Sequence, residues 1–164
     1  MQPEKNNLIQ HETADRRSLL GLGFETQAKV QLLVVDDSPE SNRLFSLATR
    51  NLPAHLLQAT NPLQALDVLS ENSIDLLVLD WDLGDITGAD FLNMYLKNRR
   101  AFKNADKPFY LITYSASDKE EITLPKAFQS NYLGHFKKTL PFKKLRENFF
   151  RIYNTLIIKE ATNA

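Results

Sequence analysis

The stretch Ile74–Gly88, IDLLVLDWDLGDITG, decides the fold of this chain. It opens with an apolar run that only Asp75 interrupts, reaches Asp80, and then turns through a segment rich in Asp and Gly. A Leu- and Val-rich run closed in this way is typical of a strand buried on both faces of a parallel sheet. Functional groups in such sheets gather just beyond the carboxyl ends of the strands. Asp80 is therefore the candidate reactive group.

Outward from this stretch, apolar runs of strand length alternate with segments of helical periodicity. Ser38 and Asn61, each followed by proline, are typical of the residues that cap the start of a helix. Five strands alternating with five helices predict a doubly wound α/β fold, with helices on both faces of a parallel sheet. The predicted strands are Gln31–Asp36, His55–Thr60, Ile74–Asp80, Pro108–Tyr114 and Leu133–Lys138, and the last three predicted helices are Ala89–Phe102, Asp118–Phe128 and Pro141–Ile158.

Length and composition indicate one domain with no global preference for nucleic acid or membrane. The 164 residues suffice for a proper core, and 20 basic residues balance 20 acidic ones. There is no cysteine, which excludes disulfides and thiolate metal sites. No apolar run approaches the roughly 20 residues of a membrane span. We expect a cytoplasmic protein with a flexible extension over residues 1–29, a domain over 30–160 and a short tail over 161–164.

Polar residues end several of the predicted strands and would meet at one edge of the sheet. They are Asp36 and Asp37, Asp80, Thr113 and Lys138. Crowded carboxylates are held ionised together by a cation, and an all-oxygen ligand set favours Mg²⁺. A lysine and a hydroxyl nearby suit a phosphoryl group. The pattern predicts a site that places phosphate on an aspartate.

With these residues at the ends of its predicted strands, the chain resembles the receiver domain of two-component response regulators. LLVVDDSPESNR resembles the first strand of that family with its acidic pair, and LLVLDWDLGDITG resembles the phosphoacceptor strand and its loop. PFYLIT and GHFKKT resemble the fourth strand with its hydroxyl and the fifth strand with its lysine. The resemblance covers about Gln31–Ile158. It implies a flavodoxin-like (βα)5 fold with strand order 2-1-3-4-5, and a regulatory phosphoacceptor in place of an enzyme.

The resemblance also implies a role for each matching position. Asp80 would accept the phosphoryl group from a histidine kinase, a phosphotransfer protein or a small donor such as acetyl phosphate. Thr113 and Lys138 would bind the phosphate, and His135 stands where the family often has a switching aromatic residue. Mg²⁺ would be held by Asp36, Asp37, Asp80 and the backbone carbonyl of Asp82.

The chain departs from the family pattern at several positions. Gly84 and Thr139 replace prolines, and Tyr114 replaces the small residue that follows the hydroxyl. We expect the Tyr114 ring to crowd the mouth of the site, with Trp81 as a partly exposed neighbour. Two assignments have rivals, since Lys137 could take the place of Lys138 and Ser115 that of Thr113.

The last predicted helix suggests a surface for a protein partner. Its inner face would carry Leu145, Phe149, Ile152 and Leu156, which leaves a second apolar stripe of Phe150, Tyr153 and Ile157. A chain tail folding over this stripe is the alternative. In the family, the fourth helix, fifth strand and fifth helix often carry such contacts, so we expect a downstream effector or a homodimer there. No helix-turn-helix follows, so direct DNA binding is not expected.

Two other functions compete with a phosphorylated receiver. A pseudo-receiver would bind partners without phosphorylation, and Tyr114 and the missing prolines favour it. A phosphatase of the haloacid dehalogenase type would use Asp80 as nucleophile and Asp82 as acid/base. The third position of this strand in the chain, and the acidic pair that the phosphatase leaves unexplained, count against that alternative.

Overall fold

The computed structural model describes residues 30–163, in which five strands form one parallel sheet. The strand order β2-β1-β3-β4-β5 confirms the predicted doubly wound topology. The extension predicted over residues 1–29 lies outside the described residues. The strands are β1 (Val30–Val35), β2 (Ala54–Ala59), β3 (Leu76–Asp80), β4 (Tyr110–Ser115) and β5 (Tyr132–Lys137).

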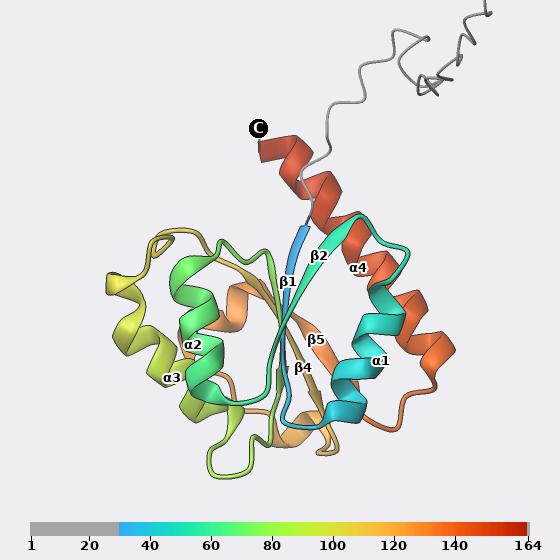
Figure 1. Cartoon of the computed structure of the whole chain (residues 1–164), viewed down its shortest axis with the longest axis horizontal. Helices are drawn as coiled ribbons and strands as arrows, with labels where there is room; N and C mark the ends of the chain where they lie inside the picture. Colours follow the sequence, from blue (N-terminus) through green and yellow to red (C-terminus); the bar gives the residue numbers. More distant parts are fainter. Residues whose placement is uncertain (1–29, 164) are drawn as a thin grey trace, which may run out of the picture.

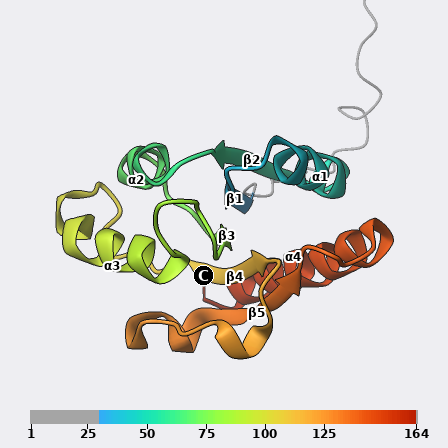
Figure 2. The same ribbon diagram turned by 90° about the horizontal axis from the view of Figure 1, so that it is seen from below.

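Within the part of the chain that the structure describes, four α-helices cover the sheet in two layers. Helices α2 (Pro62–Glu71) and α3 (Gly88–Asn98) lie on one face, and α1 (Pro39–Thr49) and α4 (Phe142–Asn163) lie on the other (Figures 1 and 2). Helix α4 continues past residue 160, where a tail was predicted to begin. None of the helices within residues 30–163 is long and apolar enough to cross a membrane.

Strand β3 is the centre of the core, as its sequence predicts. All five of its residues are buried, and its side chains alternate between the two helix layers. Leu77 and Leu79 pack in the cluster covered by α2 and α3, while Leu76 and Val78 pack in the cluster with α1 and α4. Because β3 is buried on both faces, its last residue, Asp80, is held at a fixed position on the sheet edge.

Asp75, the one charge in the apolar run, joins three strands at the opposite edge of the sheet. Its Oδ2 accepts a hydrogen bond from the backbone N–H of Gln31 at 2.7 Å, and its Oδ1 pairs with Lys107 Nζ at 2.6 Å. The backbone carbonyl of Asp75 accepts from the N–H of Tyr110 at 2.8 Å. A buried carboxylate satisfied in this way serves the structure.

The helix predicted over Asp118–Phe128 is absent, and two 3₁₀ segments take its place. They are Lys119–Glu121 and Lys126–Asn131, separated by a stretch that ends at Pro125. Proline lacks a backbone N–H and disfavours helical geometry in the residue before it, so a helix cannot run through this position. The expectation that an α-helix at this position carries part of the partner surface is therefore wrong.

The predicted stripe on the last helix is also wrong in part. Tyr153 is only 8% exposed and belongs to the core cluster with Phe149 and Leu156. Ile157 packs partly against the same cluster, whereas Phe150 is 56% exposed. The helix packs against both the sheet and its neighbour α1, so its buried face is wider than a single apolar stripe. Of the three predicted partner residues, Phe150 alone is well exposed.

Candidate functional site

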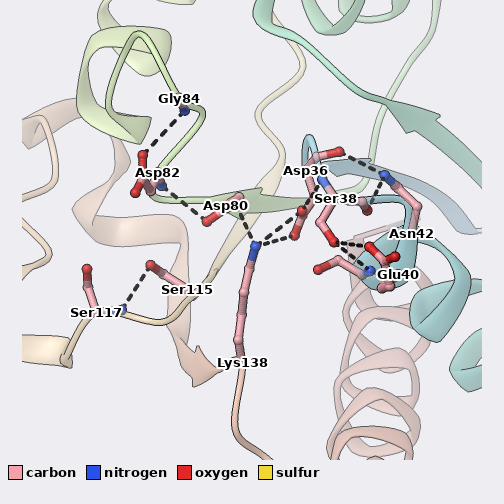
Figure 3. Close-up of polar contacts among 11 residues, drawn as sticks. Asp36, Ser38, Glu40, Asn42, Asp80, Asp82, Gly84, Ser115, Ser117 and Lys138 are labelled. Atoms are coloured by element: carbon pink, nitrogen blue, oxygen red, sulfur yellow. Dashed lines mark hydrogen bonds and ion pairs between the residues drawn. The ribbon is translucent and has the colours of Figure 1, made fainter.

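The carboxyl ends of β1, β3 and β5 bring three carboxylates and one ammonium group together. Asp36 and Asp37 follow β1, Asp80 ends β3, and Lys138 follows β5. One oxygen from each of the three aspartates lies within 4.8 Å of the others. Lys138 Nζ lies 2.6 Å from Asp80 Oδ2 and 3.0 Å from Asp36 Oδ2. Figure 3 shows the lysine reaching between these two carboxylates.

Lys138, and not its neighbour Lys137, lies in this site. Lys137 points elsewhere and pairs with Asp118 at 2.6 Å on the exposed surface. The backbone N–H of Lys138 donates to the carbonyl of Ser115 at 2.8 Å, which joins β5 to the end of β4. The register chosen from the sequence thus agrees with the geometry.

Asp36 is held in place by burial and by hydrogen bonds to its carboxylate and its backbone carbonyl. It is 1% exposed, its Oδ1 accepts from the N–H of Ser38 at 2.9 Å, and its carbonyl accepts from Asn42 Nδ2 at 2.8 Å. Its Oδ2 faces Lys138 at 3.0 Å but has no hydrogen bond of good geometry. Buried carboxylate oxygens are rarely left in this state, so Asp36 Oδ2 is available to a further ligand.

At each of Asp80 and Lys138, burial and the oppositely charged neighbour shift the pKa in opposite directions. Burial is the largest influence on Asp80 and raises its pKa, although Lys138 and the N–H of Asp82 act to lower it. For Lys138, burial is again the largest influence and acts to lower the pKa. The hydrogen bonds to Asp80 and Asp36 outweigh it, so the pKa of Lys138 is raised and the ammonium stays charged.

The loop after Asp80 is shaped by two glycines. Asp80 Oδ1 accepts from the N–H of Asp82 at 3.1 Å, and Asp82 Oδ1 accepts from the N–H of Gly84 at 3.3 Å. Gly84 has a φ of +78°, which proline cannot adopt. The loop therefore turns differently from one with the family's proline at this position. Gly88 donates its N–H to the carbonyl of Trp81 at 2.9 Å.

Gly88→Ala is expected to displace Trp81 and destabilise the fold by about 1–3 kcal/mol, the usual cost of overpacking. A Cβ at Gly88 would lie 2.5 Å from Trp81 Cε3 and 3.2 Å from the carbonyl of Asp80. Trp81 is 8% exposed, so it is a core residue and not the partly exposed one that we expected. Urea unfolding and the Trp81 emission spectrum measure both effects.

Gly84→Ala is the matched control. Its Cβ would meet nothing closer than 3.8 Å, so its cost comes from the backbone conformation alone. We expect lower stability without a shift of the Trp81 emission. If Gly88→Ala leaves that emission unchanged, the close packing of Trp81 on Gly88 is not present in solution.

The structure places Ser115, the rival of Thr113, in a cleft together with Ser117, and it places Thr113 outside the cleft. This cleft of about 280 Å³ is lined by Ser115, while Thr113 is fully buried outside it and bonded to Tyr132 and His135. Thr113 pairs with Leu79, one residue before the end of β3. The cleft is lined by Asp37, Asp80, Asp82, Gly84, Ser115, Ala116, Ser117 and Lys138.

The Tyr114 ring does not crowd the mouth of the site. It is 2% exposed and packs edge-to-face on Phe45, with ring centroids 4.8 Å apart. Lys138 Nζ lies 5.7 Å from the centroid of this ring, a distance at which cation–π attraction is favourable. Tyr114 therefore supports the lysine from the core. Ala116, one residue after Ser115, is the small residue that borders the cleft.

The donor set fits Mg²⁺. The candidate side-chain ligands are carboxylate oxygens, Asp37 is exposed at the cleft, and Asp36 Oδ2 is a buried oxygen without a hydrogen bond. Mg²⁺ takes one or two carboxylates and keeps several waters, which an open cleft allows. The backbone carbonyl of Asp82 stays a predicted ligand.

Comparison with known proteins points to one family. Residues 32–150 match the family model described as the response regulator receiver domain. The chain is similar to the chemotaxis protein CheY-3 of Vibrio cholerae, with 29% identity over 129 residues that cover 77% of this chain and 94% of that protein. It is also similar to the chemotaxis protein CheY of Pseudomonas aeruginosa, with 26% identity over 76% of this chain and 96% of that protein.

Solved structures share the fold. The signal receiver domain of a Luxo repressor protein from Vibrio parahaemolyticus superposes with a TM-score of 0.65 at 17% identity, covering 83% of this chain and 98% of that one. The chemotaxis response regulator CheY4 of Vibrio cholerae superposes with a TM-score of 0.61 at 18% identity, covering 76% and 98%. At this level of identity the likeness supports the fold alone.

Proposed function

The chain belongs to the response regulator receiver domain family, and from this premise we propose that it accepts a phosphoryl group on Asp80 and signals through protein contacts. The observation that carries the proposal is the junction of Asp80 with Asp36, Asp37 and Lys138 at one sheet edge. Asp80 ends a strand that is buried along its length, so its carboxylate is held in place before the donor arrives.

The proposed reaction is a displacement at phosphorus. A carboxylate oxygen of Asp80 forms a bond to phosphorus, and the bond to the donor breaks, with its electron pair leaving on the histidine nitrogen or the acetate oxygen. The donor would be a histidine kinase, a phosphotransfer protein or a small donor such as acetyl phosphate. Lys138 would compensate the phosphate charge, and the Ser115 hydroxyl would donate to a phosphate oxygen.

Mg²⁺ would be held by Asp36, Asp37 and Asp80. When bound, it offsets the negative charge that gathers as phosphate approaches the carboxylates. Asp36 Oδ2 and the exposed Asp37 are the oxygens of this chain that support the assignment.

The output would be a changed contact with another protein, a downstream effector or a second copy. We assign this contact to β5 and α4, since the segment before β5 forms 3₁₀ turns and no α-helix. Phe150 borders a groove of about 270 Å³ between α1 and α4. Phosphorylation would shift the population between two arrangements of this face.

The fluorescence of Trp81 tests the Mg²⁺ and phosphate parts of the proposal. Trp81 is the single tryptophan and is covalently joined to Asp80. We expect a saturable change with Mg²⁺, and a second one when beryllofluoride, a phosphoryl mimic, is added. Asp37→Asn should weaken the Mg²⁺ response at least about tenfold, because a neutral amide binds a divalent cation poorly.

Asp85→Asn is the matched control, since Asp85 is exposed in the same loop but lies outside the carboxylate cluster. Its Mg²⁺ titration should match that of the wild type. Equal losses for the two variants would assign the response to general surface charge. No response to either probe would favour the pseudo-receiver.

A further inference from the structure

The groove between α1 and α4 has the composition of a protein-contact surface. Its lining is half apolar and half polar, and consists of Ala48, Leu52 and Phe150 with Asn51, Arg146 and Glu147. Ala48 is 4% exposed while Phe150 is 56% exposed, so solvent reaches an apolar wall of the groove. Its volume of about 270 Å³ lies below the roughly 300–1,000 Å³ of small-molecule pockets. The groove therefore suits the apolar side chains of a peptide better than a small ligand.

The sequence before β1 contains a short apolar segment that suits this groove. Residues 19–24, LLGLGF, hold every large apolar side chain between positions 10 and 29. Leu20, Leu22 and Phe24 alternate with two glycines. In an extended chain these three side chains would share one side, with no side chain from the glycines on the other. Such a segment gains free energy when an apolar surface covers it.

The groove lies close to the point where the chain enters the sheet. β1 begins at Val30, which pairs with Ala54 in β2 (Figure 1), and Leu52 comes two residues before Ala54. Neighbouring strands lie about 4.8 Å apart and two residues span at most about 7 Å, so Leu52 is within about 12 Å of Val30. Phe24 precedes Val30 by six positions, which reach up to about 20 Å. The segment can therefore reach the groove.

The charges beside the segment and beside the groove are complementary. Glu25 directly follows Phe24 in the sequence. Arg146 is exposed where it lines the groove, and it forms no ion pair with any residue of the described range 30–163. A carboxylate that follows the apolar segment would find this guanidinium at the edge of the groove.

We propose that residues 19–24 bind in the groove between α1 and α4 of their own chain, with their apolar side chains against Phe150. Tethering favours this occupant over a second copy of the protein. A short flexible linker gives an effective concentration on the order of mM, so weak contacts suffice. The bound segment covers Phe150, and another protein that uses this face must displace it. The inference goes beyond the proposed function and needs no phosphoryl group.

Disulfide formation in the full chain tests the proposal, because the protein has no cysteine of its own. Glu25→Cys leaves the apolar segment intact, and Asn51→Cys places the second thiol in the groove. Mass spectrometry follows the disulfide in dilute protein under a mild oxidant. Each rate is normalised to the reaction of the single-cysteine variants with a small disulfide.

Ser73→Cys replaces Asn51→Cys in the matched control. Ser73 comes two residues before Asp75, whose N–H donates to the carbonyl of Gln31 at 2.9 Å. It is thus as close to the start of β1 as the groove is, but it lies on the side of α2 and α3. We expect the disulfide to form at least about tenfold faster with Asn51→Cys, since the free tether alone serves both positions equally.

Four serine substitutions show whether apolar contacts hold the segment. Adding Leu22→Ser and Phe24→Ser together should lower the rate to that of the Ser73→Cys control. Phe150→Ser should do the same from the side of the groove. Phe142→Ser should leave the rate unchanged, because Phe142 is 39% exposed on the same helix but does not line the groove.

Three results would each overturn the inference. They are equal rates with Asn51→Cys and Ser73→Cys, a rate that Leu22→Ser with Phe24→Ser does not lower, and a disulfide that joins two molecules. The last result would assign the groove to a second copy. No phosphodonor is present in this experiment, so failure of the inference leaves the proposed phosphorylation of Asp80 standing.

Discussion

Asp80→Asn is expected to lower covalent labelling by acetyl phosphate more than about a hundredfold while the domain stays folded. An amide is not a nucleophile toward phosphorus, and no other carboxylate in the cleft ends a buried strand in the same way. Phosphate incorporation with Mg²⁺, followed over time, measures the loss. Circular dichroism shows whether the fold is retained.

Asp82→Asn is the matched control for this variant. The change in charge and size is the same, and Asp82 lines the same cleft two residues further along the chain. Its predicted contribution comes from the backbone, so labelling should fall less than about tenfold. Labelling that survives in Asp80→Asn would show that the acceptor is misassigned.

The same variant makes a pH-dependent prediction for stability. Burial raises the pKa of Asp80 above 3.8, so the ionised form is less favourable in the folded than in the unfolded state. Below 3.8 the carboxyl is protonated in both states. As the pH rises through the raised pKa, the free energy of unfolding of the wild-type protein falls, because the folded state must then hold an ionised carboxylate that burial disfavours. Asp80→Asn has no carboxyl at this position and does not show this fall.

Asp80→Asn should therefore gain stability relative to the wild type between acidic and neutral pH in metal-free buffer. Lys138 keeps Asp36 as a partner in the variant, so its charge is not left unpaired. Urea unfolding across this pH range measures the difference. A difference that moves in the opposite direction would mean that the Lys138 pairing outweighs burial.

Lys138→Met is expected to destabilise the metal-free protein by roughly 1–3 kcal/mol. Removing one partner of a buried ion pair costs about 3–5 kcal/mol. Lys138 is 25% exposed while Asp36 and Asp80 are nearly fully buried, so solvent reduces that cost. The two carboxylates would then repel each other without the ammonium between them. Urea unfolding in the presence of a chelator measures the loss.

Mg²⁺ should restore much of this stability and bind Lys138→Met about fivefold to tenfold more tightly, since a neighbouring positive charge is gone. Lys137→Met is the matched control. Its ion pair with Asp118 is exposed, so the stability should change by less than about 0.5 kcal/mol. Equal effects of the two variants would contradict the assignment of Lys138 to the carboxylate cluster.

The strand order and the carboxylate cluster could be predicted because each depends on a local pattern. The buried strand that ends on Asp80 is visible in the sequence as an apolar run that only Asp75 interrupts. Parallel alternation then places the ends of β1, β3 and β5 together. Ser38 caps α1 as predicted, since its Oγ accepts from the N–H of Ser41.

The choice between Thr113 and Ser115 needed the structure. Residues two apart in a strand share a face, so the pattern alone does not tell which one reaches the edge. The outcome depends on where β4 ends, and β4 runs to Ser115, one residue further than predicted. The small residue after Ser115, Ala116, was the signal in the sequence that favours this register.

The bulge at Leu133 in β5 and the 3₁₀ segments before β5 could not be predicted from the sequence pattern. A bulge leaves no mark in an alternating pattern other than a nearby glycine, here Gly134 with a φ of +140°. Without the bulge, the contact of Tyr132 with Thr113 could not be inferred. Pro125 is the feature of the sequence that indicates a poor α-helix in the segment before β5.

The most direct test of the central claim is to locate the phosphoryl group itself. The protein is treated with acetyl phosphate and Mg²⁺, reduced with borohydride, which converts an aspartyl phosphate to homoserine, and digested for peptide mass spectrometry. Our account predicts homoserine at residue 80 and at no other aspartate, and none when Mg²⁺ is chelated. Homoserine at Asp36, Asp37 or Asp82, or at no position, would contradict it.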